Sequence, residues 1–257
     1  YGYRTTGMSS GDLEALDEQG MLEVDGPIWR FRSDVVREVA YQTLTKLVRA
    51  QRHGGTAAVM SRDPRIPLDQ IAHHAACAAE LSAEIGPVPG MPDDIADQAV
   101  GLLFEAAKRS MDVGAFNQVR LQTTRALDLG PSDTALAREL LLLRAQAHAE
   151  RRAVVPALAD AEDALEAAVA AGDVRQEGIA RRLLGVLHQR DGDLAGARRE
   201  LGASVDIFRE LGDDTELASS LRERGLAEVF GGSLGDAEWL LGEAEALTER
   251  MHDARGR

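Results

Sequence analysis

A serine that could act as a nucleophile lies near the beginning of the sequence. Residues 7–11 read Gly-Met-Ser-Ser-Gly, which matches the Gly-x-Ser-x-Gly pattern that exposes a catalytic serine, here Ser9, for acyl transfer. That pattern works at a sharp turn between a core strand and a helix of a parallel sheet. Six residues precede it and no parallel sheet is predicted. We therefore interpret the segment as a loop or helix cap and keep an enzyme that uses Ser9 as an alternative.

Potential metal ligands come together once in the sequence. His73 and Cys77 are four residues apart and could share a helical face, with His74 beside them. Two ligands leave a closed site incomplete, because such a site takes four. The other histidines are scattered along the chain: His53, His148, His188 and His252. We interpret these side chains as helix-packing residues and expect no metal site. Cys77 is the only cysteine, which excludes an intramolecular disulfide.

Two lysines are the only candidates for a phosphate-binding loop. Such a loop reads Gly-x4-Gly-Lys-Ser/Thr, so that backbone amides and one lysine surround the phosphates. Lys46 follows Thr45 and Lys108 follows Ala107, and neither fits. No carboxylate arrangement of a nucleotide cyclase is recognisable either. We expect a chain that is not an enzyme and binds no cofactor.

Charge divides the sequence near residue 65. The first 65 residues carry nine basic and nine acidic side chains, and the remainder carries 20 and 34, which accounts for the net charge of −14. A chain this acidic repels nucleic acid unless a basic face compensates. No apolar run reaches the ~18 residues of a membrane span, and no signal peptide is recognisable. The chain begins at Tyr1 without a methionine, so we expect a cytoplasmic piece cut from a longer protein.

The neutral part, residues 1–65, predicts a small α+β unit. A helical run over residues 12–19 ends at Gly20, and apolar and charged residues then alternate on both sides of Asp25-Gly26-Pro27, as in a β-hairpin. Ser33 begins a second helix with apolar residues at helical spacing. Helix, hairpin and helix together predict a winged-helix-like adaptor.

Residues 66–257 predict helices up to the end of the chain. Glycine after the last helical residue fits a left-handed helix end, and short connections make neighbouring helices antiparallel. The predicted stops are Gly86, Gly114, Gly130, Gly172, Gly192, Gly212 and Gly231-Gly232. The expected fold class is mainly α, an α-solenoid of helix pairs preceded by the small α+β unit.

The helical part repeats itself at a spacing of about 40 residues. Small residues recur at relative positions 0, 12 and 19 of four units, with Val119 as the one larger residue. The triplets are Ala107-Val119-Ala126, Ala145-Ala157-Ala164, Gly185-Ala197-Ser204 and Gly225-Ala237-Ala244. Glycine inside a helix costs about 1 kcal/mol relative to alanine. We therefore expect close helix crossings at Gly185 and Gly225, within pairs that stack into a right-handed solenoid.

This repeat resembles the tetratricopeptide (TPR) family over roughly residues 95–250. Leu184-Gly185 matches the Leu-Gly of the family's first helix, Ala197 and Ala237 match the alanine of the second, and Pro131 fits the terminal proline. The family's early tryptophan is absent and three units exceed the usual length. The resemblance implies a TPR-like solenoid.

Residues 20–80 resemble the segment that joins the ATPase core to the TPR region in large actinobacterial regulators. These regulators combine a signal-transduction (STAND) ATPase with a nucleotide cyclase or a LuxR-type DNA-binding domain. The resemblance rests on residues 29–41, 49–53 and 71–74, with Ser33 where the family usually has histidine. It implies an upstream ATPase or effector domain in the same polypeptide. The adaptor residues expected to contact it are Trp29, Arg30, Arg32 and Arg37.

In TPR folds the first helices of the pairs line a concave groove. Counting from Gly185 and Gly225 gives the expected groove residues: Arg182, Val186, Gln189, Arg222, Leu226, Val229 and Phe230. The two arginines could pair a peptide carboxylate bidentately. The alternative is that they pair with acidic residues of neighbouring helices. Val186 and Leu226 stand where chaperone-binding members have asparagine, so that carboxylate clamp is not expected.

Three functions follow from these patterns. The leading hypothesis is a non-catalytic interaction and sensing module that binds a peptide, a protein or a sister subunit and so acts on an upstream effector. The second is DNA binding through the winged helix, which the neutral charge of that unit disfavours. The third is an enzyme that uses Ser9 or an unrecognised acid pair.

Overall fold

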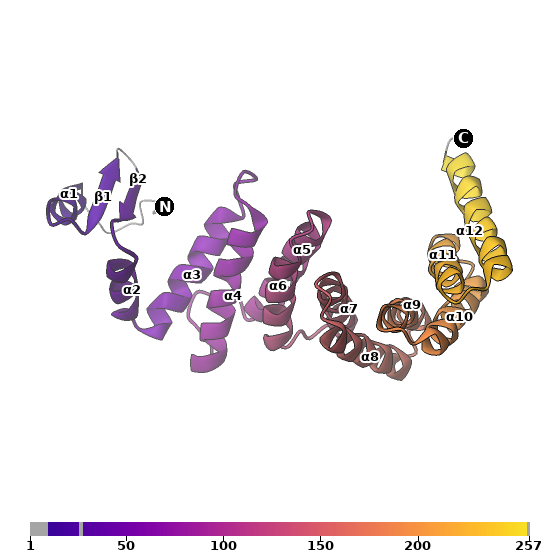
Figure 1. Cartoon of the computed structure of the whole chain (residues 1–257). Helices are drawn as coiled ribbons and strands as arrows, with labels where there is room; N and C mark the ends of the chain where they lie inside the picture. The colour runs from indigo at the N-terminus through magenta and orange to yellow at the C-terminus, as the bar shows by residue number, and fades with distance from the viewer. Residues whose placement is uncertain (1–9, 26–27, 256–257) are drawn as a thin grey trace.

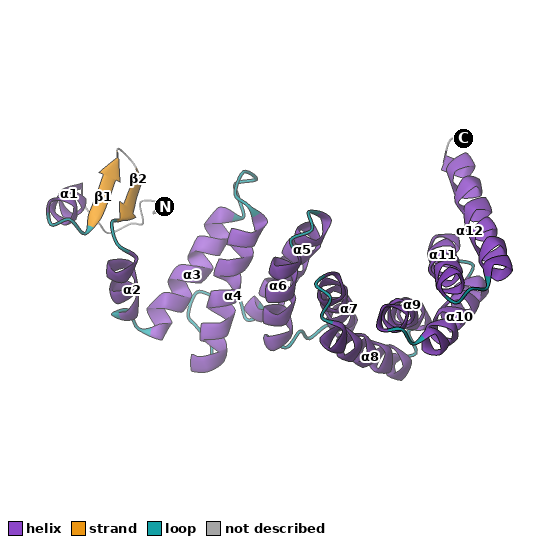
Figure 2. Cartoon of the chain, in the orientation of Figure 1, coloured by secondary structure: helices purple, strands orange, loops and turns teal. Residues whose placement is uncertain are grey.

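The computed structural model describes residues 10–25 and 28–255, which form twelve helices and one β-hairpin (Figures 1 and 2). The hairpin consists of β1 (Leu22–Asp25) and β2 (Ile28–Phe31). The helices are, in chain order, α1 (Ser10–Glu18), α2 (Asp34–Gln42), α3 (Lys46–Met60), α4 (Leu68–Ile85), α5 (Ile95–Asp112), α6 (Phe116–Asp128), α7 (Thr134–Glu150), α8 (Val154–Ala171), α9 (Val174–Asp191), α10 (Leu194–Leu211), α11 (Asp214–Phe230) and α12 (Leu234–Arg255).

The N-terminal unit has the predicted order of helix, hairpin and helix. The two strands are antiparallel, with Leu22 opposite Phe31, and Leu13 of α1 and Leu22 are buried. The Ser33 side chain accepts a hydrogen bond from the Val35 amide and so begins α2 as predicted. The predicted turn at Gly26-Pro27 lies outside the described residues. No residue of α2 is buried, so the apolar face expected of this helix is open.

The remaining helices form a curved array in which each helix packs against the next along the chain (Figure 1). Alternate helices also touch, α5 with α7, α7 with α9, and α9 with α11. These first helices of successive pairs therefore form an inner row, and in Figure 1 α8, α10 and α12 lie on the outer side of the curve. The predicted α-solenoid is confirmed. The predicted boundary at residue 65 remains a prediction, and α3, which precedes it, packs against α4.

Left-handed glycines end the helices where the sequence indicates stops. Gly172 and Gly212 follow α8 and α10 with a φ of +67° each, a value that glycine adopts without steric cost. The turn between α7 and α8 is different, because its left-handed residue is Arg152, with a φ of +58°. Among the described residues, Arg152 is the one non-glycine residue with a positive φ.

The small residues of the repeat lie where the two helices of a pair cross. A β-carbon on Gly185 in α9 would overlap Leu201 Cγ of α10 and lie 3.2 Å from the Ala197 carbonyl oxygen. A β-carbon on Gly225 in α11 would lie 2.8 Å from Leu241 Cγ of α12. Both contacts with a leucine Cγ are shorter than real carbon atoms tolerate, so the predicted close crossings are confirmed. In both crossings the atom nearest to the added β-carbon belongs to a leucine side chain, and the facing backbone lies further away.

A buried hydroxyl explains the one serine among the small residues. Ser204 Oγ donates a hydrogen bond to the Gly178 carbonyl oxygen (2.9 Å) and lies 2.9 Å from Ser220 Oγ. Both serine side chains are fully buried. Because buried hydroxyls are costly without partners, this chain of bonds fixes α10 against both α9 and α11.

The close crossing predicts that a Gly→Ala substitution changes the free energy of unfolding in opposite directions at two helical glycines. Gly185→Ala should lower the free energy of unfolding by about 1–3 kcal/mol, because the new methyl group overpacks the α9–α10 contact. Gly242→Ala in α12 is the control, since a β-carbon there meets nothing within 4 Å. It should raise the free energy of unfolding by up to about 1 kcal/mol through helix propensity. Urea denaturation measures both, and equal effects of the two substitutions would contradict the crossing.

Candidate functional site

Arg182 holds two helices of the inner row together. Its Nη1 atom lies 2.6 Å from Glu216 Oε2 of α11, and its guanidinium carbon lies 6.0 Å from the centre of the Phe208 ring. Glu216 also binds Arg175, at 2.9 Å. Arg182 therefore makes the intramolecular pair that the sequence left open as the alternative to binding a carboxylate.

The other predicted groove residues differ in how far they reach solvent. Arg222 is exposed and pairs with the adjacent Glu223 at 3.1 Å. Val186 and Gln189 are half-buried. Their roles as groove residues remain predictions.

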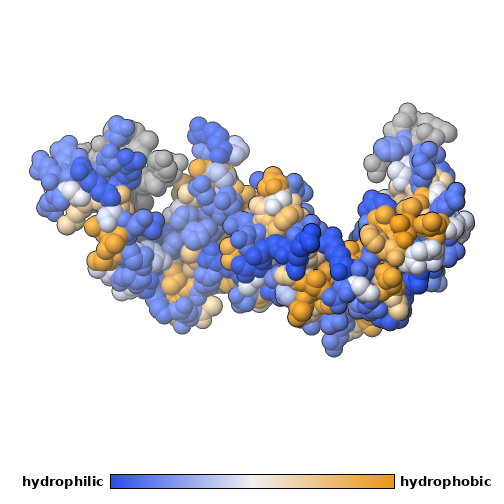
Figure 3. Space-filling model, viewed as in Figure 1, coloured by the Kyte–Doolittle hydropathy of each residue, from blue (hydrophilic) through white to orange (hydrophobic). Residues whose placement is uncertain are grey.

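Apolar side chains are exposed at the end of α11. Leu226, Val229 and Phe230 are 38%, 43% and 71% exposed, and a hydrophobic area lies over α11 in the space-filling view (Figure 3). Clustered exposed apolar side chains on a folded chain mark a surface for another molecule.

A hollow of about 700 Å³ opens beside Phe230 at the edge where α7, α9 and α11 end. We call it the inner-edge hollow. It is lined by Ala149, Glu150, Arg152, Val154, Leu187, Arg190 and Phe230. Arg190 Nη2 lies 3.1 Å from Glu150 Oε1. Among the residues that line this hollow, Phe230 is the one that was predicted from the sequence as a groove residue. The signal for Glu150 and Arg190 was present, because the 40-residue register places both at the position of Phe230.

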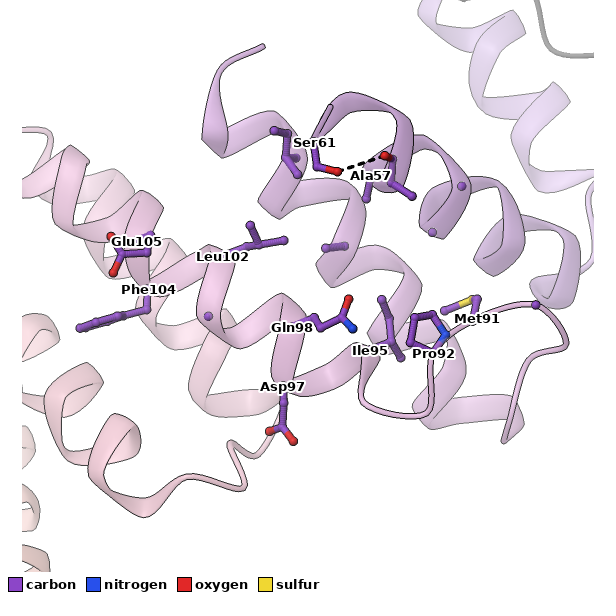
Figure 4. Close-up of a pocket in the computed structure, with 17 residues that line it drawn as sticks. Ala57, Ser61, Met91, Pro92, Ile95, Asp97, Gln98, Leu102, Phe104 and Glu105 are labelled. Carbon is purple, nitrogen blue, oxygen red and sulfur yellow. Dashed lines mark hydrogen bonds between the residues drawn. The ribbon is translucent and has the colours of Figure 1, made fainter. Parts of the chain in front are cut away.

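A second hollow, of about 770 Å³, lies between α3, α4 and α5, and was missed by the sequence analysis (Figure 4). Met91, Leu102 and Ile95 contribute apolar lining. A β-carbon at Gly55 or Gly101 would meet nothing within 4 Å, so these helical glycines leave the space open.

The polar side chains around this second hollow are used elsewhere. Asp97 accepts hydrogen bonds from the amide and hydroxyl of Ser132 and points away from the apolar lining in Figure 4. Gln98 donates to Asp94, and Glu105 pairs with Lys108. Ser61 also lines the hollow, and its hydroxyl donates a hydrogen bond to the Ala58 carbonyl oxygen. The hollow therefore presents mainly apolar surface.

Three arginines of the N-terminal unit each have an acidic partner. Arg30 pairs with Glu23 at 2.5 Å, and Arg32 pairs with Asp17 at 2.9 Å. Arg37 lies 3.5 Å from Asp34. The charge of these three arginines is therefore compensated by neighbouring carboxylates. The side chain of Trp29 and the whole of Ser9 lie outside the described residues.

Three histidines meet between α3 and α4. His53 Nδ1 lies 2.8 Å from His74 Nδ1, and the centre of the His73 ring lies 5.4 Å from that of His74. The expectation that His53 is scattered from the other two was wrong. The antiparallel packing of α3 on α4 brings residues 21 positions apart to the same level. Tyr41 of α2 is hydrogen-bonded to His53 Nε2 at 3.0 Å.

Arg125 of α6 completes this cluster from the other side. Its guanidinium binds both carboxylate oxygens of Glu80, at 2.5 and 2.8 Å, and donates to Cys77 Sγ at 3.1 Å. A further nitrogen lies 3.2 Å from His73 Nδ1. The pair with Glu80 raises the pKa of Arg125. Within the described parts of the chain, no three His, Cys, Asp or Glu side chains are arranged to hold a metal ion.

Burial and nearby positive groups lower the pKa of all three histidines. Burial, followed by the nearby His74 and His73, lowers the pKa of His53 from 6.5 to about 4. Burial also lowers the pKa of His73, with a contribution from Arg125, and that of His74, with a contribution from His73.

The fold is similar to solved tetratricopeptide-repeat structures, although no family model and no curated protein matches the sequence. BtubC from P. vanneervenii is 15% identical over 83% of this chain and 92% of its own, with a TM-score of 0.56. YrrB, described as a TPR protein with an unusual peptide-binding site, is 14% identical over 84% of this chain and 92% of its own, with a TM-score of 0.51.

A signal-transduction ATPase from Pyrococcus horikoshii, a STAND protein with a tetratricopeptide repeat sensor, is also similar. It is 14% identical over 95% of this chain and 46% of its own, with a TM-score of 0.50. Identities this low show the fold alone, which is a TPR-like α-solenoid. The winged-helix character of the N-terminal unit remains a prediction. Among the described helices, none combines the length and the apolar content of a membrane span.

The histidine cluster predicts a stability that falls with acidity. Because the folded pKa of His53 lies below its unfolded value, the unfolded chain binds more protons below pH 6.5. The free energy of unfolding should therefore decrease as the pH falls from 6.5 towards about 4. Urea denaturation at pH 7.5 and pH 5 measures the decrease, and His53→Gln should reduce it. His252→Gln, at an exposed site in α12, is the control, and an equal pH dependence in both variants would contradict the assignment.

Proposed function

We propose that this chain is a non-catalytic interaction module whose inner row of helices binds a peptide or protein partner. The observation that carries the proposal is the apolar end of α11, where Leu226, Val229 and Phe230 are exposed and Phe230 lines the inner-edge hollow. Apolar anchors beside a pocket are the usual centre of a protein interface. The peptide-binding site of the similarly folded YrrB supports the proposal.

We also propose that the module belongs to a larger, cytoplasmic signal-transduction ATPase regulator. The similar fold of a STAND ATPase with a TPR sensor, of which this chain matches 46%, supports it. The N-terminal unit would then be the adaptor to the ATPase, through Trp29, Arg30, Arg32 and Arg37. Val35 and Val39 on the open face of α2 are 71% and 59% exposed and extend that contact. A sister subunit is a further candidate partner of the solenoid.

The binding surface is tested by a matched pair of aromatic substitutions. Peptides selected on the full chain from a random displayed library should bind Phe230→Ala at least tenfold more weakly, because a large exposed anchor is lost. Trp239→Ala is the control, since Trp239 is 64% exposed but lies on α12, outside the inner row. Fluorescence polarisation with the selected peptides measures both affinities. Selection of no peptide, or an equal loss in both variants, would contradict the proposed function.

A further inference from the structure

The turn between α7 and α8 has the same backbone conformation as the turns that follow α5, α9 and α11, but a different residue at its left-handed position. Gly114, Gly192 and Gly232 occupy the equivalent position in the other pairs, with φ values of +71°, +89° and +77°. Arg152 has a φ of +58°. A side chain in this left-handed region is strained, and glycine avoids that strain. The chain therefore carries an arginine at a place where the fold itself favours glycine.

The Arg152 side chain does nothing for the fold that would explain this strain. It is exposed and makes no hydrogen bond or ion pair with the residues that the structure describes. Other arginines of the solenoid link helices, as Arg182 does with Glu216 and Arg198 with Glu228. What Arg152 contributes is its place in the lining of the inner-edge hollow.

The charges of the inner-edge hollow favour an acidic ligand. Two guanidinium groups, those of Arg152 and Arg190, line it against the single carboxylate of Glu150. Since Glu150 already pairs with Arg190 at 3.1 Å, the positive charge of Arg152 is uncompensated there. The solenoid as a whole is strongly acidic, so this local excess is a feature that a negatively charged segment can distinguish.

The apolar lining adds a second requirement. Ala149, Val154 and Leu187 give the hollow its apolar surface, and Phe230, 71% exposed, is its aromatic wall. An arginine fork binds a carboxylate through two hydrogen bonds. An exposed ring contributes most when a bulky apolar side chain covers it.

We propose that the inner-edge hollow binds an acidic segment of a partner protein, in which an Asp or Glu side chain pairs with Arg152 and a neighbouring bulky apolar side chain packs on Phe230. This inference rests on the proposed function and names the chemistry of its partner. It also gives the left-handed arginine its role, which is to carry a free guanidinium at the rim of the hollow.

The test uses random twelve-residue peptides displayed for selection on the full chain. The selected peptides should be enriched in Asp or Glu beside Leu, Ile, Phe or Trp relative to the starting library. Synthetic copies with amidated C-termini should bind Arg152→Gly and Arg152→Gln about tenfold or more weakly, the loss of one charge-assisted pair. Arg62→Gln is the control, since it removes an exposed arginine from the distant α3–α4 turn.

A stability measurement separates lost binding from lost folding. Arg152→Gly should melt at the same temperature as the wild-type chain or higher, because glycine relieves the left-handed strain. Weak binding by this variant then reports the missing guanidinium. A lower melting temperature with lost binding in Arg152→Gly, together with full binding by Arg152→Gln, would overturn the proposal.

The other possible results of the peptide selection separate failure of the acidic-segment proposal from failure of the proposed function. Selected peptides without acidic enrichment, or peptides that bind both Arg152 variants as tightly as wild type, overturn the acidic-segment assignment and leave the proposed function standing. Peptides that bind only with a free C-terminal carboxylate show that the hollow binds a chain end, which also overturns the side-chain assignment. Selection of no peptide at all overturns both proposals.

Discussion

The close crossing of the two helices in each pair is the contact on which the rest of this structure depends. It requires a small side chain, glycine or alanine, at one level of the first helix, and in three of the four pairs alanine at the facing level of the second. Gly185 against Ala197 and Gly225 against Ala237 meet that requirement, with Leu201 and Leu241 filling the space that the glycines leave. Because the same contact recurs every 40 residues or so, each pair presents a similar outer surface to the next pair. A chain of similar contacts builds an extended array with several small cores in place of one large core.

Curvature then decides which residues can act together. Alternate helices touch along the inner row, so equivalent positions of successive repeats become neighbours in space although they are 40 residues apart in sequence. Glu150, Arg190 and Phe230 are such a series, and they line one hollow. The same geometry lets Arg182 of α9 reach Glu216 of α11. Arg198 of α10 reaches Glu228 across the contact between consecutive helices. Many arginines of the solenoid thus form ion pairs between helices, whereas Arg152 and the exposed Phe230 lie at the inner-edge hollow.

The features that local spacing encodes could be predicted from the sequence. Glycine stops and the two hairpin strands are encoded within one turn or one short segment, and the close crossings are encoded by small residues at a fixed spacing; the structure has all three. The meeting of His53 with His73 and His74 was not predicted, because it depends on how far α3 slides along α4. The two hollows were missed for a related reason, since an unfilled volume such as that at Gly55 and Gly101 belongs to no single segment. Arg152 was visible in principle, as the one arginine where the repeat register expects glycine.

The inner edge of the solenoid is its proposed binding surface. Hydrogen exchange of backbone amides, followed by mass spectrometry with and without a saturating selected peptide, tests this claim most directly. Turn amides exchange faster than those of packed helices, so the relevant turns are sensitive reporters. The account predicts slower exchange on binding in the turns at residues 151–153, 191–193 and 231–233. Protection confined to the outer helices α8, α10 and α12, or to the N-terminal unit, would contradict it.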